Sequence, residues 1–365
     1  MRLRANKTVA VPSRSMAVGI NYMWGYNKYG LYFGTHWRFG EAERELWMDD
    51  WLTEFECNLT RWRQDDLRVS VVRIFLYCNL QSYGSVSASG RWELPSPGDA
   101  RYPAFMGRYL SQFEEMLRIC ARTGMKLIPS LVDFGIGAPL PHLEREQRWS
   151  IITDRSVRDQ FFAQAMVPLL EISQRPEYRT TLYAWEVMNE PSWLTGSLWP
   201  RPGQTPKVVS PRVTQSELWE FLHKGVSEIH SRGLPSTVGH RFYDDMSTYP
   251  TGLGPQFHYY PAFYNADPTP LPHYNATDPG RIRRAILGEF AAGTEGNTWT
   301  GLFGRDEPGA RERVRERLLE ASRLGYRLSV LWPDLPPWGG PIGAPDPKLS
   351  SEALDGIRDY WSAAP

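Results

Sequence analysis

The sequence has little of three things that often reveal a protein's class: net charge, cysteine and long apolar runs. Its 365 residues hold 41 Lys and Arg against 41 Asp and Glu, so the formal net charge is zero. A neutral chain gives no electrostatic reason to expect a nucleic acid or an anionic membrane as a partner. Three cysteines are an odd and sparse set, which argues against a disulfide framework. Cys57, Cys78 and Cys120 lie in apolar-periodic segments, so we expect buried thiols.

The apolar runs are too short for a transmembrane helix, and residues 1–15 lack the apolar stretch of a signal peptide. We therefore expect a tail over 1–15, one domain over 16–365 and a cytoplasmic location, or a secreted one if a leader has been removed. Neither the cysteines nor the seven histidines have the spacing of zinc ligands, and no glycine-rich nucleotide loop follows the first strands. We expect no metal and no cofactor, and the oligomeric state stays open.

Aromatic residues, in contrast, are plentiful: 15 Trp, 18 Tyr and 15 Phe make up 13% of the chain. Many of them fit a large core, but others gather in segments with the composition of loops, among them Trp24 and Trp193. An exposed aromatic ring can stack on the apolar face that the axial C–H bonds of a pyranose present. Any one of these rings could be packed in the interior, but the set favours a sugar-binding surface.

Eight short apolar runs alternate with longer amphipathic stretches. The runs are 16–21, 70–77, 126–132, 182–188, 237–240, 256–259, 285–289 and 328–332. Three amphipathic helical patterns end near a glycine (Gly124, Gly233 and Gly325) and are followed by the next run. This alternation predicts βαβ units and a parallel sheet. Eight strands without a nucleotide-binding loop favour an α/β protein with a single-domain (β/α)8 TIM barrel and long βα loops over an open doubly wound sheet. The long loops would include 191–212 and 240–256.

Reacting groups in such a barrel lie at the carboxyl ends of the strands. That rule selects Asn21, Tyr22, Arg73, Asp133, Asn189, Glu190, His258, Tyr260, Glu289 and Trp332. Glu190 and Glu289 directly follow the fourth and seventh apolar runs, where a carboxylate is costly unless it is paired or used. Either could simply form an ion pair with an arginine, but two such residues also suit the hydrolysis of a glycosidic bond.

Hydrolysis with retention of configuration needs two carboxyl groups with different tasks. One attacks the anomeric carbon, while the other protonates the leaving oxygen and later activates water, and the two lie roughly 5–5.5 Å apart. Strands four and seven face each other across a barrel, so their tips can meet over the axis. The negative charge of one acid favours the protonated form of the other, which the acid role requires.

The segments around both glutamates resemble those of a known clan of glycoside hydrolases, whose acid/base and nucleophile lie on strands four and seven. Trp-Glu-Val-Met-Asn-Glu-Pro (185–191) is similar to the clan's Asn-Glu-Pro signature and to the Trp-Glu-x-x-Asn-Glu-Pro of mannanases, and Gly-Glu-Phe (288–290) is similar to the nucleophile strand. The resemblance is closest to family 5, with its β-mannanases and β-glucanases, and spans about residues 16–340. It implies Glu190 as acid/base, Glu289 as nucleophile and an oligosaccharide or polysaccharide as partner.

The same resemblance implies roles for two polar residues deep in the barrel. Arg73 would hydrogen-bond Glu289 and hold it ionised, although an ordinary ion pair at the edge of the core is the alternative. Asn189 would donate to the 2-hydroxyl of the sugar, a contact that tightens in the transition state, although it could instead be a helix cap.

On the later strands, His258 and Tyr260 are similar to the clan's His-x-Tyr, with Tyr260 near the nucleophile; the alternative is a pair of satisfied polar groups in a loop. Trp332 would form the floor beneath the reacting sugar. The peptide bond after this tryptophan is often cis in the clan, and because the next residue is Pro333 we expect a cis bond here. Asn21, Trp24 and Trp193 complete the expected substrate contacts.

One position departs from the family pattern. Val132-Asp133-Phe134-Gly135 stands where many family 5 members carry a histidine, so Asp133 could contact sugar hydroxyls or cap the loop. The main alternative function is a catalytically inactive barrel that binds carbohydrate, but both glutamates are present. A metal-dependent hydrolase and a phosphate-binding barrel lack their ligand patterns. The sugar, its linkage and endo or exo action stay open.

Overall fold

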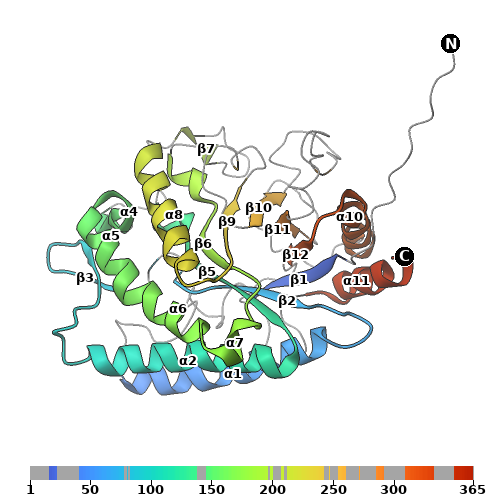
Figure 1. Cartoon of the computed structure of the whole chain (residues 1–365), viewed down its shortest axis with the longest axis horizontal. Helices are drawn as coiled ribbons and strands as arrows, with labels where there is room; N and C mark the ends of the chain where they lie inside the picture. The colour runs from blue at the N-terminus through green and yellow to red at the C-terminus, as the bar shows by residue number, and fades with distance from the viewer. Residues whose placement is uncertain are drawn as a thin grey trace, which may run out of the picture.

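Eight parallel strands close into a barrel in the order β1-β12-β11-β10-β9-β6-β5-β2 (Figure 1). They are β1 (Ala17–Tyr22), β2 (Val71–Phe75), β5 (Lys126–Asp133), β6 (Trp185–Asn189), β9 (Ser236–His240), β10 (Gly254–Tyr259), β11 (Ile286–Ala291) and β12 (Leu328–Trp332). This computed structural model describes residues 16–22, 41–77, 80, 83–137, 145–195, 198–199, 207–208, 212–241, 246, 254–259, 271, 285–291, 309–332 and 349–364. Each predicted apolar run coincides with a strand, so the predicted (β/α)8 barrel is confirmed.

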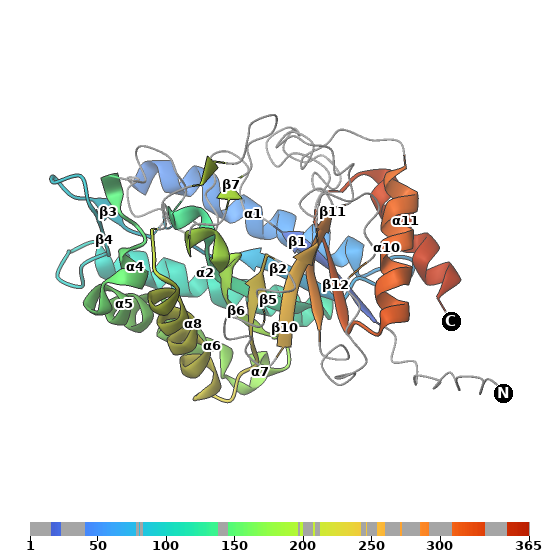
Figure 2. The same ribbon diagram turned by 90° about the horizontal axis from the view of Figure 1, so that it is seen from above.

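Helices cover the outside of the barrel, with α1 and α2 along one flank and α10 and α11 along another (Figures 1 and 2). The longer ones are α1 (Glu41–Trp62), α2 (Tyr102–Thr123), α5 (Arg155–Phe161), α6 (Val167–Ser173), α8 (Gln215–His230), α10 (Ala310–Leu324) and α11 (Ser351–Ala363). Shorter turns are η1 (Phe134–Gly137), α4 (Ser150–Thr153), the π turn η2 (Phe162–Met166), α7 (Pro176–Arg179) and η3 (Pro191–Thr195). Two small antiparallel pairs, β3 (Ser85–Val86) with β4 (Trp92–Glu93) and β7 (Leu198–Trp199) with β8 (Lys207–Val208), lie outside the barrel.

The helix ends follow the local sequence signals. Gly124 and Gly325 terminate α2 and α10 in the left-handed region, with φ of 69° and 82°, which glycine adopts without a Cβ clash. At the start of α8, Thr214 and Glu217 form a reciprocal capping box. Each of these helices is followed directly by a barrel strand: α2 by β5, α8 by β9 and α10 by β12.

Side chains inside the barrel alternate with side chains that pack against the helices. On β2, Val72 and Ile74 join the large core under the helices, whereas Val71 belongs to a separate small cluster. That cluster contains Val71, Ile128, Ile286, Leu328 and Val330, which come from β2, β5, β11 and β12. Arg73 lies two residues beyond Val71, on the same side of the strand. The barrel therefore holds an apolar layer, and polar groups follow it toward the carboxyl ends of the strands.

The prediction of buried thiols is confirmed for Cys120 and wrong for Cys57, which is exposed on α1. Cys78 lies outside the described residues. The buried face of α1 is formed by Trp51, Phe55, Leu59 and Trp62. These residues follow the spacing of one helix face, and Cys57 falls on the opposite side. Among the described residues, no helix is both long and apolar enough to cross a bilayer.

Candidate active site

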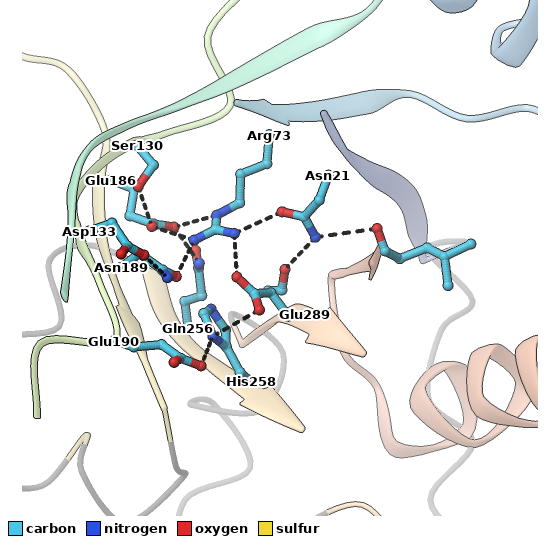
Figure 3. Close-up of polar contacts among 12 residues, drawn as sticks. Asn21, Arg73, Ser130, Asp133, Glu186, Asn189, Glu190, Gln256, His258 and Glu289 are labelled. Carbon is cyan, nitrogen blue, oxygen red and sulfur yellow. Dashed lines mark hydrogen bonds and ion pairs between the residues drawn. The ribbon is translucent and has the colours of Figure 1, made fainter. Parts of the chain in front are cut away.

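Polar side chains from β1, β2, β5, β6, β10 and β11 meet at the carboxyl end of the barrel (Figure 3). They are Asn21, Arg73, Ser130, Asp133, Glu186, Asn189, Glu190, Gln256, His258 and Glu289. Seven of the predicted site residues belong to this group. Ser130, Glu186 and Gln256 were not among the predictions.

The strands that carry the two glutamates and the histidine are irregular where these residues lie. The pairing of β6 with β9 shifts within 186–189, that of β10 with β11 at 257–258, and that of β11 with β12 within 287–290. A bulge bends a strand and re-aims its side chains. Glu190, directly after β6, has a φ of 47°, a conformation that costs a non-glycine residue about 1–3 kcal/mol and that clusters at active sites.

Arg73 is the hub of the group. It is fully buried, and each of its five N–H groups has an acceptor. Nε and Nη2 donate to the two carboxylate oxygens of Glu186 at 2.8 and 2.6 Å. Nη1 donates to Asn21 Oδ1 and Glu289 Oε1, both at 2.7 Å, and the second proton of Nη2 goes to Asn189 Oδ1 at 2.6 Å. The predicted contact between Arg73 and Glu289 is therefore present.

Glu186 is a fully buried carboxylate whose four acceptor positions are occupied. Besides Arg73, the Ser130 hydroxyl donates to Oε1 at 2.7 Å and the Gln256 amide donates to Oε2. Burial alone would raise the pKa of Glu186, but the charge and hydrogen bonds of Arg73 outweigh it and hold the pKa below its usual value. The available sequence signal was a glutamate inside an otherwise apolar buried strand, four residues before Glu190.

Glu289 is held at both its side chain and its backbone. Its Oε1 accepts from Arg73, and its Oε2 lies 3.4 Å from His258 Nδ1. The Asn21 amide donates to the carbonyl of Gly288 at 3.2 Å, which fixes the strand just before the glutamate. A guanidinium in direct contact favours the ionised form of this carboxylate. Because Asn21 also bonds Arg73 and is fully buried, its amide groups are engaged within the protein.

Each carboxylate oxygen of Glu190 has one hydrogen-bond partner. The Trp193 indole N–H donates to Oε2 at 2.6 Å, and His258 Nδ1 is hydrogen-bonded to Oε1 at 2.8 Å. Trp193, predicted as a sugar-stacking residue, is thus bonded to the carboxylate through its edge. One of its ring faces lies against the Arg241 guanidinium, 4.1 Å from the ring centroid, and Phe134 packs against it at 5.9 Å.

His258 is completely buried between the two glutamates. Burial lowers its pKa to about 4; the charge of Arg73 acts in the same direction, and the negative charge of Glu289 opposes it. The imidazole is therefore neutral at pH 7. When Glu190 is ionised it can only accept, so Nδ1 then carries the proton and donates to it; when Glu190 is protonated, its O–H can donate to Nδ1 instead.

Asp133 and Asn189 form the edge of the group beside Glu190. The Asn189 amide donates to Asp133 Oδ2, and the backbone N–H of Gly135 donates to Asp133 Oδ1, both at 2.6 Å. Burial raises the pKa of Asp133 to about 7, assisted by the nearby charge of Glu190, although both hydrogen bonds oppose the shift. Asp133 therefore caps the start of its loop and orients Asn189, whose carbonyl oxygen accepts from Arg73.

Trp332 ends β12 and is half-buried, with its ring 6.3 Å from that of Phe75 in an edge-to-face arrangement. The expected cis bond involves Pro333, which lies outside the described residues. Tyr260 and Trp24 lie outside them as well. Their predicted substrate contacts stay predictions.

The two predicted reacting groups come together in space. One carboxylate oxygen of Glu190, one of Glu289 and a ring nitrogen of His258 all lie within 4.8 Å of one another. Two carboxylates and an imidazole are chemically able to hold a divalent cation. His258 Nδ1 also lies 2.8 Å from Glu190 Oε1, so these two groups are hydrogen-bonded directly to each other.

The fold has relatives among solved structures, although no family model and no curated protein matches the sequence. The β-mannanase from the blue mussel Mytilus edulis superposes with a TM-score of 0.56 and 15% identity, over 96% of this chain and 92% of that chain. A β-1,4-mannanase from the sea hare Aplysia kurodai gives 0.59 and 14%, over 96% and 93%. A GH5_18 protein from Streptomyces cattleya, in complex with GlcNAc, gives 0.54 and 14%, over 96% and 82%. At these identities the comparisons establish that the chain shares its barrel fold with β-mannanases.

Proposed function

We propose that the protein is a retaining glycoside hydrolase that cleaves β-glycosidic bonds in a β-linked oligosaccharide or polysaccharide of the β-mannan or β-glucan type. The observation that carries this proposal is the approach of Glu190 and Glu289, whose nearest carboxylate oxygens fall within 4.8 Å. Carboxyl groups of retaining enzymes lie roughly 5–5.5 Å apart, whereas inverting enzymes need roughly 6.5–9.5 Å to fit a water molecule. The fold shared with β-mannanases supports the substrate class.

The first step transfers the sugar to the enzyme. Glu289 Oε1 is bound to Arg73, so Oε2, which faces His258, is the oxygen that attacks the anomeric carbon. As the C–O bond to the leaving group breaks, Glu190 gives its proton to the departing oxygen. The product of this step is an ester between Glu289 and the sugar, with Glu190 now ionised.

The second step returns the enzyme to its starting state. Ionised Glu190 takes a proton from water, and the resulting hydroxide equivalent attacks the anomeric carbon and displaces Glu289 as a carboxylate. The N–H groups of Trp193 and His258 stabilise the ionised form of Glu190 in this step, while the charge of Glu289 favours its protonated form in the first. Glu190 thus has an environment suited to both states.

The remaining predicted residues would hold the substrate. Asn189 has a second amide proton beyond the one given to Asp133, and this proton suits a sugar hydroxyl. Trp332 and Trp24 would offer aromatic faces to sugar rings, and Tyr260 would lie near the nucleophile. The reaction as written requires no metal or cofactor.

The test is an activity screen on aryl β-glycosides and soluble β-glycans with the wild-type protein, Glu289→Ala and Glu190→Ala. Glu289→Ala should abolish turnover. For Glu190→Ala, azide should partly restore turnover of an activated substrate, because azide needs no general base, and the product should be the β-glycosyl azide. Full activity of both variants would refute the assignment, and glycan binding without turnover by the wild type would favour an inactive carbohydrate-binding barrel.

A further inference from the structure

Glu186 lies too deep in the barrel to act on a sugar, yet several side chains of the site are arranged to hydrogen-bond it. Its side chain is fully buried, and all its hydrogen bonds go to protein groups. Glycines at two neighbouring positions leave room for the network. A Cβ on Gly239 would lie 3.0 Å from Glu186 Oε1, and a Cβ on Gly288 would lie 2.5 Å from the Gln256 amide nitrogen.

The fold alone does not require this arrangement. Buried ion pairs can often be replaced by apolar side chains of similar volume at no cost in stability, because desolvation offsets the attraction. The layer beneath is already packed with Val71, Ile128 and their neighbours. A fully satisfied ion pair directly behind a reacting group is better explained by what it does to that group.

The charges around Arg73 indicate how the ion pair acts on Glu289. One guanidinium is shared by two carboxylates, Glu186 through two hydrogen bonds and Glu289 through one. His258 is neutral, because burial holds its pKa at about 4. With Glu186 ionised, Arg73 is already neutralised, and the charge of Glu289 is left largely uncompensated toward the site where positive charge develops on the sugar.

We propose that Glu186 is a positioning residue that acts through Arg73: it holds the guanidinium in one orientation and neutralises it, so that Glu289 is fixed in place but remains a strong nucleophile. Without Glu186, the whole charge of Arg73 would act on Glu289. The nucleophile would then be more strongly stabilised as an anion and less reactive. This inference rests on the proposed function of Glu289.

Glu186→Gln tests the proposal, because it removes the charge while keeping the shape. The rate of inactivation by a 2-deoxy-2-fluoroglycoside with a good leaving group reports attack by Glu289 directly, for the sugar that the activity screen identifies. We expect this rate to fall roughly 10- to 100-fold, as for loss of a partner that orients a reacting group. The acidic limb of the kcat/KM profile should move to lower pH, with KM little changed.

Two matched variants separate charge from structure. Glu186→Asp keeps the charge and should keep the acidic limb in place, with partial recovery of the rate. Ser130→Ala removes one hydrogen bond to Glu186 but leaves its charge, so it should lower the inactivation rate less than Glu186→Gln and leave the acidic limb in place. An unchanged limb and rate in folded Glu186→Gln would overturn the proposal, as would an equal effect in Ser130→Ala. If the wild type itself has no glycosidase activity, the failure lies with the proposed function instead.

A measurement on the wild type covers the case in which Glu186→Gln does not fold. In ¹³C-carboxyl NMR, with the signal assigned by its loss in Glu186→Asp, Glu186 should remain ionised throughout the acidic limb. A Glu186 that takes up its proton together with the loss of activity would refute the proposal.

Discussion

Replacing Arg73 by methionine should destabilise the protein in a strongly pH-dependent way. The change keeps most of the buried volume but removes all five hydrogen bonds of the guanidinium. Three of these bonds go to carboxylate oxygens of Glu186 and Glu289, which are 0% and 3% exposed. Both carboxylates would remain in the barrel without their cation.

The expected loss of stability is limited by the free energy needed to protonate a buried carboxylate. Three hydrogen bonds to charged groups, at roughly 1.5–3 kcal/mol each, give a gross loss of about 4.5–9 kcal/mol. A buried carboxylate can avoid much of this loss by taking a proton. For a group with an ordinary pKa of 4.5, that costs about 3.4 kcal/mol at pH 7, at about 1.36 kcal/mol per pH unit. We therefore expect Arg73→Met to lose about 3–5 kcal/mol at neutral pH, the usual range for breaking a buried pair.

The sign of the pH dependence follows from Glu186. In the wild type its pKa lies below the ordinary value, so it contributes stability above that value, which is lost as the pH falls through the folded-state pKa. In Arg73→Met, burial without the cation raises the pKa instead. The deficit of the variant should therefore shrink by about 1.4 kcal/mol for each pH unit below neutrality, down to about pH 5.

Urea unfolding of both proteins between about pH 5 and 8, followed by tryptophan fluorescence and circular dichroism, measures the difference. The control is Arg122→Met, which breaks surface pairs with Glu56 and Glu115; the three side chains are 44%, 37% and 33% exposed. That change should cost under about 1 kcal/mol. Equal losses in the two variants, or a loss in Arg73→Met that does not vary with pH, would refute the reasoning.

Three further predictions follow from contacts near the reacting groups. Trp193→Phe removes the indole N–H that donates to Glu190. Loss of this donor favours the protonated form of Glu190, so the basic limb of the pH–activity profile should move to higher pH. A basic limb that stays in place would contradict this role of Trp193. Burial raises the pKa of Asp133 to about 7, so this residue lowers the stability of the folded state as the pH rises toward 7, with no further loss above pH 7. In thermal unfolding, the stability of Asp133→Asn relative to the wild type should therefore be higher at about pH 8 than at about pH 5. A difference in stability that is the same at both pH values would argue against this. Gly288→Ala places a Cβ 2.5 Å from the Gln256 amide nitrogen and should cost about 1–3 kcal/mol in urea unfolding, whereas a change within about 0.5 kcal/mol would mean that the network moves aside.

The barrel is predictable because its strands are buried on both faces and most of them therefore appear as continuous apolar runs. The short runs 237–240 and 256–259 predict strands even though no helix pattern separates them. Helix ends were predictable at Gly124 and Gly325, because each adopts a left-handed φ that glycine favours. In these cases a local physical requirement leaves a local mark in the sequence.

The site was predictable only in part. Glu190 and Glu289 stand out because each follows a strand at its carboxyl end. Glu186 belongs to the same site but lies within a strand, and its pairing with Arg73 spans 113 positions of the chain. The orientation of Trp193, with its face toward a sugar or its edge toward a carboxylate, depends on the turn that begins at Glu190. The positive φ of Glu190 is not predicted by any local sequence pattern.

The positive φ of Glu190 places the stability of the fold and the proposed activity in opposition at this residue. Glycine adopts a φ of 47° freely, whereas glutamate does so at a cost of about 1–3 kcal/mol. Glu190→Gly should therefore unfold at a higher temperature than Glu190→Ala, and selection for heat resistance alone carries no pressure to keep the proposed acid/base at this position. Selection for thermostability in this protein should include a turnover screen from the first round.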